Sequence, residues 1–146
     1  MTPSDSAIDL RDFWAVDEHA FITLWRKYEL KRPWNDPYRV IRRKLVAGHD
    51  GFWIGYVGPR LIAGIMVGYD VHRGTVNYLA VDHAFAGHGH DQLLMERAEA
   101  FFLEKGCPNV NICRRPDNGA VRALCESLAY EKDDVVVLGK RLIPND

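Results

Sequence analysis

The sequence predicts an α/β fold, α+β in some schemes, in which helices flank a mixed, largely antiparallel sheet with a central βαβ unit. Three β-rich runs lie at 52–57, 61–69 and 75–81, and the connections between them are too short for anything but hairpins. A glycine-containing loop, an amphipathic helix and another apolar run come next, an order that makes two strands parallel. With 47% apolar residues in a chain of 146, one hydrophobic core can form, so we expect a single domain over 1–146.

Two helices are predicted before the sheet. Asp17 can cap the first helix, whose apolar residues between positions 21 and 25 recur near helical spacing. Asp36 stands before Pro37, which places a capping side chain next to a residue that suits the first helical turn. The second helix is therefore expected over about 37–47.

The second half of the chain alternates helices and strands. Gln92 to Lys105 carries its apolar residues on one side and predicts a helix, which Gly106 can end. A short strand over 110–113, a helix over 118–128 and a final strand over 135–142 complete the predicted order ααβββαβαβ. Because edge strands can pair with another chain, the final strand could join two copies in a homodimer.

Composition excludes several function classes. The 19 basic and 20 acidic residues leave a formal charge of -1, so nothing in the overall charge favours nucleic acid or an anionic membrane, and neither is expected as a partner. The first residues lack a signal-peptide pattern and no run approaches the length of a membrane span, so we expect a soluble, cytoplasmic protein. The three cysteines are an odd number without CxxC spacing, which argues against a disulfide framework or a zinc knuckle.

The loop after the third β-rich run is the strongest candidate for a binding site. It reads FAGHGHD over 85–91 and opens directly into a helix. Glycines let successive backbone N–H groups face outward, and the free amides of a helix start add partial positive charge, which suits a pyrophosphate. A tight connection between strand and helix would explain the same glycines. The cluster of His83, His88, His90 and Asp91 also suggests a metal, but further ligands of a recognisable site are missing and no metal is expected.

The order of the elements together with this loop resembles the GNAT superfamily of N-acetyltransferases over nearly the full chain. The segment NGAVRALCESLAY at 118–130 is similar to a second motif of the superfamily. RPWNDP at 32–37 and LGKRLI at 138–143 look like a small bacterial subgroup of it. The sequence departs from the family pattern at four places: Ala86 replaces Gln or Arg, Asp91 replaces Gly or Ala, Cys125 replaces Tyr, and Ala129 replaces Gly.

The resemblance implies transfer of an acetyl group from acetyl-CoA to an unidentified small-molecule or peptide amine, by direct attack without an acyl-enzyme. It implies that the coenzyme is bound by the loop, by the main chain of the preceding strand and by an asparagine of the second motif: Gly87, His88, Gly89, His90, Asp91, Leu79, Ala80, Val81 and Asn118. It places Trp34, Asn35 and Asp36 beside the acceptor, although Trp34 can equally be packed and Asp36 can be a helix cap.

The candidate catalytic residues come from two places. Cys125 stands at the position of the usual acid, where a thiol could donate a proton, although buried helix cysteines are usually apolar fillers. Tyr69 or His72 could assist deprotonation of the amine, although they could also belong to a solvated turn. The unusual residues leave one alternative from another class, a GNAT-shaped coenzyme-binding or regulatory module that has lost catalysis.

Overall fold

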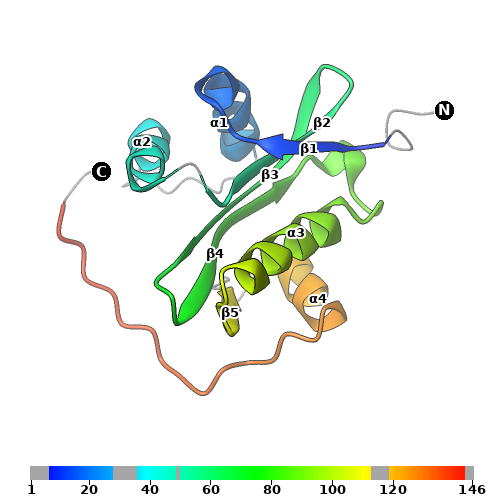
Figure 1. The fold of residues 1–146 in the computed structure, drawn as a ribbon. Coiled ribbons are helices and arrows are strands. Elements are labelled where there is room, and N and C mark those ends of the chain that lie inside the picture. The colour runs from blue at the N-terminus through cyan, green and yellow to red at the C-terminus, as the bar shows by residue number, and fades with distance from the viewer. Residues whose placement is uncertain (1–6, 28–35, 49, 113–118, 144–146) are drawn as a thin grey trace.

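The computed structural model describes residues 7–27, 36–48, 50–112 and 119–143, which form one five-stranded sheet with helices on both faces (Figure 1). The strands are β1 (Asp9–Asp12), β2 (Phe52–Val57), β3 (Arg60–Tyr69), β4 (Arg73–Val81) and β5 (Asn109–Ile112). They lie side by side in chain order. The pairs from β1 to β4 are antiparallel, whereas β4 and β5 are parallel. The predicted meander, the parallel pair and the mixed α/β fold class are confirmed.

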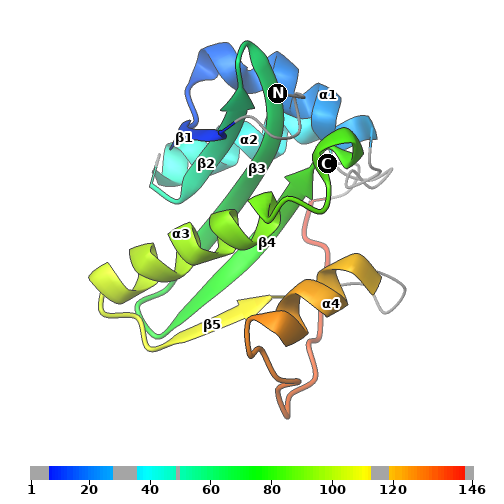
Figure 2. The same ribbon diagram turned by 90° about the vertical axis from the view of Figure 1, so that its right-hand side faces the viewer.

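The described residues form four α-helices, which pack around the sheet (Figures 1 and 2). The first two cover one face, the third covers the other, and the fourth lies beside β5. Two short 3-10 turns occupy Ala15–Asp17 and His83–Phe85. The helices are α1 (Glu18–Lys27), α2 (Pro37–Ala47), α3 (His90–Glu104) and α4 (Gly119–Ser127). No helix in the described part of the chain is long and apolar enough to cross a membrane.

Aromatic side chains pack between α1 and the face of the sheet that it covers. The rings of Phe13 and Phe52 stack with their centroids 4.1 Å apart, and Phe21 of α1 meets Phe52 edge-on at 5.0 Å. A Cβ atom at Gly64 of β3 would collide with the Phe21 ring, so this glycine lets α1 approach the sheet closely. Burial of these rings fixes α1 on the sheet and stabilises this half of the core.

The opposite face is covered by α3. Its apolar side was predicted from helical spacing, and Leu94, Ala98 and Phe102 are buried against the sheet. A Cβ atom at Gly74 would meet the Phe102 ring at 2.5 Å, so this glycine again allows close packing between helix and strand. Because α3 is the crossover helix between β4 and β5, its packing sets the position of the loop that precedes it.

Three features at the two ends of the chain differ from the predictions. β1 was not predicted, because its sequence DLRD is short and mostly charged; it is an edge strand that pairs with β2. Asp17 does not cap α1: it ends the preceding 3-10 turn, and its carboxylate accepts the N–H of Trp14 at 3.0 Å and the hydroxyl of Tyr56 at 2.7 Å. The predicted final strand over 135–142 is wrong, because these residues pair with none of the described strands and lie exposed.

Candidate active site

The described part of β5 pairs with only the first half of β4. β5 pairs with β4 only from Arg73 to Val76. The register with β3 shifts from Met66↔Tyr78 to Val67↔Val76, which leaves Asn77 as an extra residue in β4. Such a bulge bends and twists a strand. The described part of β5 therefore leaves one edge of β4 open from Asn77 to Val81, and that edge includes the predicted residues Leu79, Ala80 and Val81.

The loop after β4 presents main-chain N–H donors that no described residue accepts from. Gly87 and Gly89 have φ angles of 80° and 77°, a left-handed conformation that glycine adopts without strain. A Cβ atom at either glycine would meet no heavy atom of the described residues within 4 Å, so these residues leave the space above the loop open. Among the described residues, none accepts a hydrogen bond from the N–H groups of residues 87–91. These donors surround the start of α3, where the helix dipole is positive.

The carboxylate of Asp91 lies against its own main chain. Its Oδ1 atom accepts the N–H of Gln92 at 2.8 Å, which is a local bond within the first turn of α3. Asp91 adds negative charge next to the loop. The neighbouring imidazole of His88 is exposed.

His90 is the buried histidine of this loop. Its side chain is 7% exposed, and its Nε2 atom has no partner among the described residues. The ring of His88 lies 6.1 Å away. Burial lowers the pKa of His90 below its ordinary value, the charge of His88 lowers it further, and Asp91 acts in the opposite direction. No group of three or more His, Cys, Asp or Glu within 7–27, 36–48, 50–112 and 119–143 is placed to hold a metal ion.

The lowered pKa of His90 predicts a pH dependence of stability. The folded state keeps the imidazole neutral, while the unfolded chain takes up a proton as the pH falls below the ordinary pKa of about 6.5. The contribution of His90 to stability is therefore present above about pH 6.5 and is lost below it. Between about pH 7.5 and pH 5.5 we expect urea unfolding to show a larger loss for the parent protein than for His90→Gln. Equal losses in both proteins would contradict this assignment.

Asp82 fixes the start of the loop and was missed by sequence reasoning. It follows β4 directly, is 4% exposed, and its carboxylate accepts the N–H of Ala84 at 3.0 Å. The same carboxylate receives Arg60 Nη2 at 2.9 Å and Lys27 Nζ at 3.4 Å. Asp82 therefore ties the 3-10 turn before the glycines to β3 and to α1. The sequence did contain a signal for this role, because aspartate is typical of a position that follows a strand and precedes a turn.

Cys125 lies near the end of α4. It is 9% exposed, and its carbonyl accepts the N–H groups of Leu128 and Tyr130 at 3.2 and 2.9 Å. These bonds close the helix around Ala129, whose φ of 64° is the conformation that suits the glycine usual at this position. The hydroxyl of Tyr130 donates to Glu99 at 2.7 Å; burial, this bond and the charge of Glu99 raise the pKa of Tyr130. Asn118 lies outside the described residues.

Tyr69 and His72 lie away from the loop. Tyr69 is the last residue of β3, and His72 lies in the turn between β3 and β4, where Asp70 accepts the N–H of His72 at 3.1 Å. The ring of Tyr69 meets Phe101 of α3 edge-on at 6.0 Å, so it faces the α3 side of the sheet. The whole of β4, roughly 30 Å at 3.3 Å per residue, separates this turn from the glycine loop. The structure therefore does not bring these two residues together with the predicted coenzyme site.

Tyr78 of β4 faces the α1 side of the sheet, as does Ala80. Its ring lies 4.3 Å from that of Trp25, centroid to centroid, and burial raises the pKa of its hydroxyl. It stands next to the extra residue Asn77, so it lies at the open edge of β4. Its phenol stays protonated at neutral pH and can donate a hydrogen bond. Strand alternation places Tyr78 on one face, but the sequence does not show which helix covers that face.

The predicted acceptor residues are only partly described. Trp34 and Asn35 lie outside the described residues. Asp36 caps α2, as the sequence predicted: its Oδ1 atom accepts the N–H of Tyr38 at 3.0 Å, and Arg39 lies 3.7 Å from its other oxygen.

Comparisons with known proteins agree with this architecture. Residues 11–130 match the model of the acetyltransferase (GNAT) family. An acetyltransferase of Pectobacterium atrosepticum is 42% identical over 136 residues, which cover 93% of this chain and 96% of that protein. An uncharacterized N-acetyltransferase of Yersinia pestis is 40% identical over the same coverage.

Solved structures share the fold at lower identity. The ribosomal-protein-alanine N-acetyltransferase of Brucella melitensis has a TM-score of 0.75 and 20% identity, and the match covers 92% of this chain and all of that one. AAC(6')-Iy, solved with a bisubstrate analogue of CoA, has a TM-score of 0.72 and 15% identity over 94% of this chain and all of that one. The family match and the identity to the Pectobacterium protein together show that this chain belongs to the GNAT family of acetyltransferases.

Proposed function

We propose that the protein transfers an acetyl group from acetyl-CoA to an amine by direct attack in a ternary complex. The observation that carries the proposal is the set of N–H donors at residues 87–91 that have no acceptor among the described residues and that follow the open edge of β4 after one 3-10 turn. A diphosphate fits the donors and the positive end of α3. An extended pantetheine chain fits the open main chain of Leu79, Ala80 and Val81. The CoA analogue bound to AAC(6')-Iy supports this choice of donor.

In the proposed reaction the amine nitrogen attacks the thioester carbonyl and forms the new C–N bond as the C–S bond breaks. The amine loses one proton and the departing thiolate takes one up, so no acyl-enzyme is needed. We place Cys125 near the sulfur and Asn118 beside the coenzyme. Tyr69 and His72 can take up the proton of the amine only if a chain of water molecules connects them to it.

Substitution of Cys125 tests its part in the reaction. We expect Cys125→Ser to fold normally, because the change is small, and to turn over several-fold more slowly, because a hydroxyl is a much weaker acid than a thiol. The comparison is kcat at saturating acetyl-CoA. Cys107→Ser is the matched control, since Cys107 is also buried but belongs to the segment before β5. Equal kcat values for parent and Cys125→Ser would assign Cys125 to packing alone.

Calorimetry and a turnover assay together test the proposed function. Acetyl-CoA is titrated into the protein, and release of the CoA thiol is then followed across aminoglycosides, peptides with free N-termini and small amines. We expect saturable binding and thiol release with at least one amine class. Binding without release across the panel would favour a coenzyme-binding module without catalysis. No binding would contradict the proposal.

A further inference from the structure

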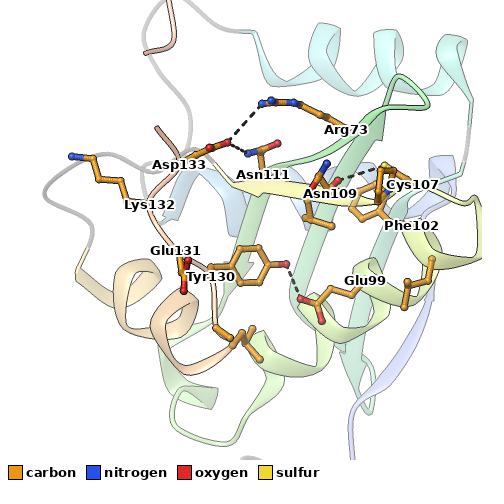
Figure 3. Close-up of a pocket in the computed structure, with 15 residues that line it drawn as sticks. Arg73, Glu99, Phe102, Cys107, Asn109, Asn111, Tyr130, Glu131, Lys132 and Asp133 are labelled. Carbon is orange, nitrogen blue, oxygen red and sulfur yellow. Dashed lines mark hydrogen bonds and ion pairs between the residues drawn. The ribbon is translucent and has the colours of Figure 1, made fainter. Parts of the chain in front are cut away.

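β5 limits how far a bound chain can extend along the edge of β4. The described part of β5 pairs with β4 as far as Val76, and Arg73 of β4 and Asn111 of β5 both contact the carboxylate of Asp133, at 3.7 and 3.2 Å (Figure 3). A pantetheine arm that starts at the diphosphate and follows this edge passes residues 81 to 77 and then meets the paired strands. The farthest point that its thioester can reach along β4 is therefore beside residues 77 and 78.

Tyr78 places a phenol hydroxyl at this point. Its ring is half-buried and lies against Trp25 of α1, tilted by 56° at a centroid distance of 4.3 Å. No described residue forms a hydrogen bond with its hydroxyl. The indole N–H of Trp25 is buried and also has no acceptor among the described residues. Two neighbouring donors without acceptors suit an oxygen atom of a ligand, because buried polar groups are normally paired.

The other side chains along the open edge do not compete for this role. Of residues 77–81, only Asn77 and Tyr78 carry side chains that form hydrogen bonds, because residues 79–81 are apolar. The amide of Asn77 lies over β3: a Cβ atom at Gly68 would meet Asn77 Nδ2 at 3.7 Å. Tyr78 is therefore the side-chain donor that stands at the open edge.

A phenol beside a thioester can act in two ways, and its acidity decides between them. It can give its proton to the departing thiolate, or it can donate a hydrogen bond to the carbonyl oxygen. An ordinary phenol has a pKa of about 10 and an ordinary thiol one of about 8.5, so proton transfer to the thiolate is uphill. Burial raises the pKa of Tyr78 and makes this transfer harder still. A hydrogen bond to the carbonyl requires only that the phenol stays protonated.

We propose that the hydroxyl of Tyr78 donates a hydrogen bond to the carbonyl oxygen of the acetyl thioester and stabilises the negative charge that develops there. The inference rests on the proposed function. When the amine attacks, an electron pair of the carbonyl moves onto its oxygen; when the C–S bond breaks, the carbonyl re-forms and an electron pair leaves with the sulfur. Tyr78 keeps its proton throughout. It is then a catalytic residue, and Trp25 is a positioning residue that holds its ring.

Tyr78→Phe tests the donor, because it removes the hydroxyl and keeps the ring against Trp25. With the amine class that releases thiol, we expect kcat at saturating acetyl-CoA to fall by about 10²–10³-fold, the usual cost of removing one donor to a developing oxyanion. Tyr38→Phe is the matched control. Tyr38 of α2 is partly buried against the same apolar core, so its variant makes the same chemical change elsewhere and should keep the parent kcat.

Infrared spectroscopy of bound acetyl-CoA supplies a readout that does not depend on turnover. The acetyl carbonyl is labelled with ¹³C, and its stretching band is recorded on the protein without an amine. We expect the band of the parent complex to lie at lower frequency than that of free acetyl-CoA, because a hydrogen bond weakens the C=O bond. In Tyr78→Phe the band should return toward the free position, whereas in Tyr38→Phe it should not. Affinity for CoA, which lacks the carbonyl, should be equal in all three proteins.

The outcomes separate this inference from the proposed function. Absence of CoA binding to the parent protein would contradict the proposed function itself. Normal CoA binding, with an unchanged carbonyl band in Tyr78→Phe, would overturn the role of Tyr78 alone, even if kcat fell. A loss of CoA affinity in Tyr78→Phe as large as its loss of acetyl-CoA affinity would also overturn it, because the ring would then serve packing and not the carbonyl.

Discussion

Substitution of Gly89 by valine is expected to weaken binding of acetyl-CoA by about tenfold or more, which corresponds to about 1.4 kcal/mol. The φ angle of Gly89 is 77°, a conformation that costs a β-branched residue about 1–2 kcal/mol. The valine side chain would also stand in the space that is now open above the loop, between a diphosphate and the amides of His90 and Asp91. Isothermal titration of parent and variant with acetyl-CoA measures the change.

Gly106→Val separates the effect on binding from backbone strain. Gly106 has a φ of 73°, its surroundings are equally open, and it lies at the opposite end of α3. Both variants should lose similar stability, because both place valine in a left-handed conformation. Only the Gly89 variant should lose affinity. Unchanged affinity in Gly89→Val, or an equal loss in both variants, would argue against coenzyme binding at this loop.

Truncation of Phe21 is expected to have the largest effect on stability. Phe21 is 1% exposed and contacts Phe13, Phe52 and Trp25 through their rings. Phe21→Ala should lower the free energy of unfolding by about 3–5 kcal/mol. The cavity would lie over Gly64, which has no side chain to fill it. Because a domain of this size has only about 5–15 kcal/mol of stability, this is a large part of the total.

Urea unfolding measures this loss, with Leu103→Ala as control. Leu103 is 77% exposed on α3, so its truncation should change the free energy of unfolding by less than about 0.5 kcal/mol. A loss of less than about 1 kcal/mol for Phe21→Ala would mean that α1 is not fixed on the sheet by this ring.

The central part of the fold could be predicted because its signals are local. Hairpins follow from the short connections between β2, β3 and β4, and the parallel pair follows from the crossover through α3. Asp36 and Pro37 mark the start of α2 because the cap bond lies within three residues. The glycines of the loop were identified for the same reason: a left-handed turn before a helix requires them.

Features that depend on distant residues could not be predicted. β1 forms because β2 offers it an edge, and its own residues Asp9–Asp12 show no apolar alternation. The buried role of Asp82 requires Arg60 and Lys27, which come from β3 and α1. The strand predicted over residues 135–142 is wrong, because high β-propensity does not by itself supply a neighbouring strand to pair with.

We propose that the main-chain N–H groups of residues 87–91 bind the diphosphate of the coenzyme. Backbone amide NMR tests it directly, by comparing titrations with CoA and with pantetheine, which lacks the diphosphate. We expect CoA to shift the amide signals of Gly87, Gly89 and the first turn of α3 strongly, because charge-assisted hydrogen bonds form there, and pantetheine to leave them in place. Amide signals that stay unmoved by CoA, or that move equally with pantetheine, would contradict the account.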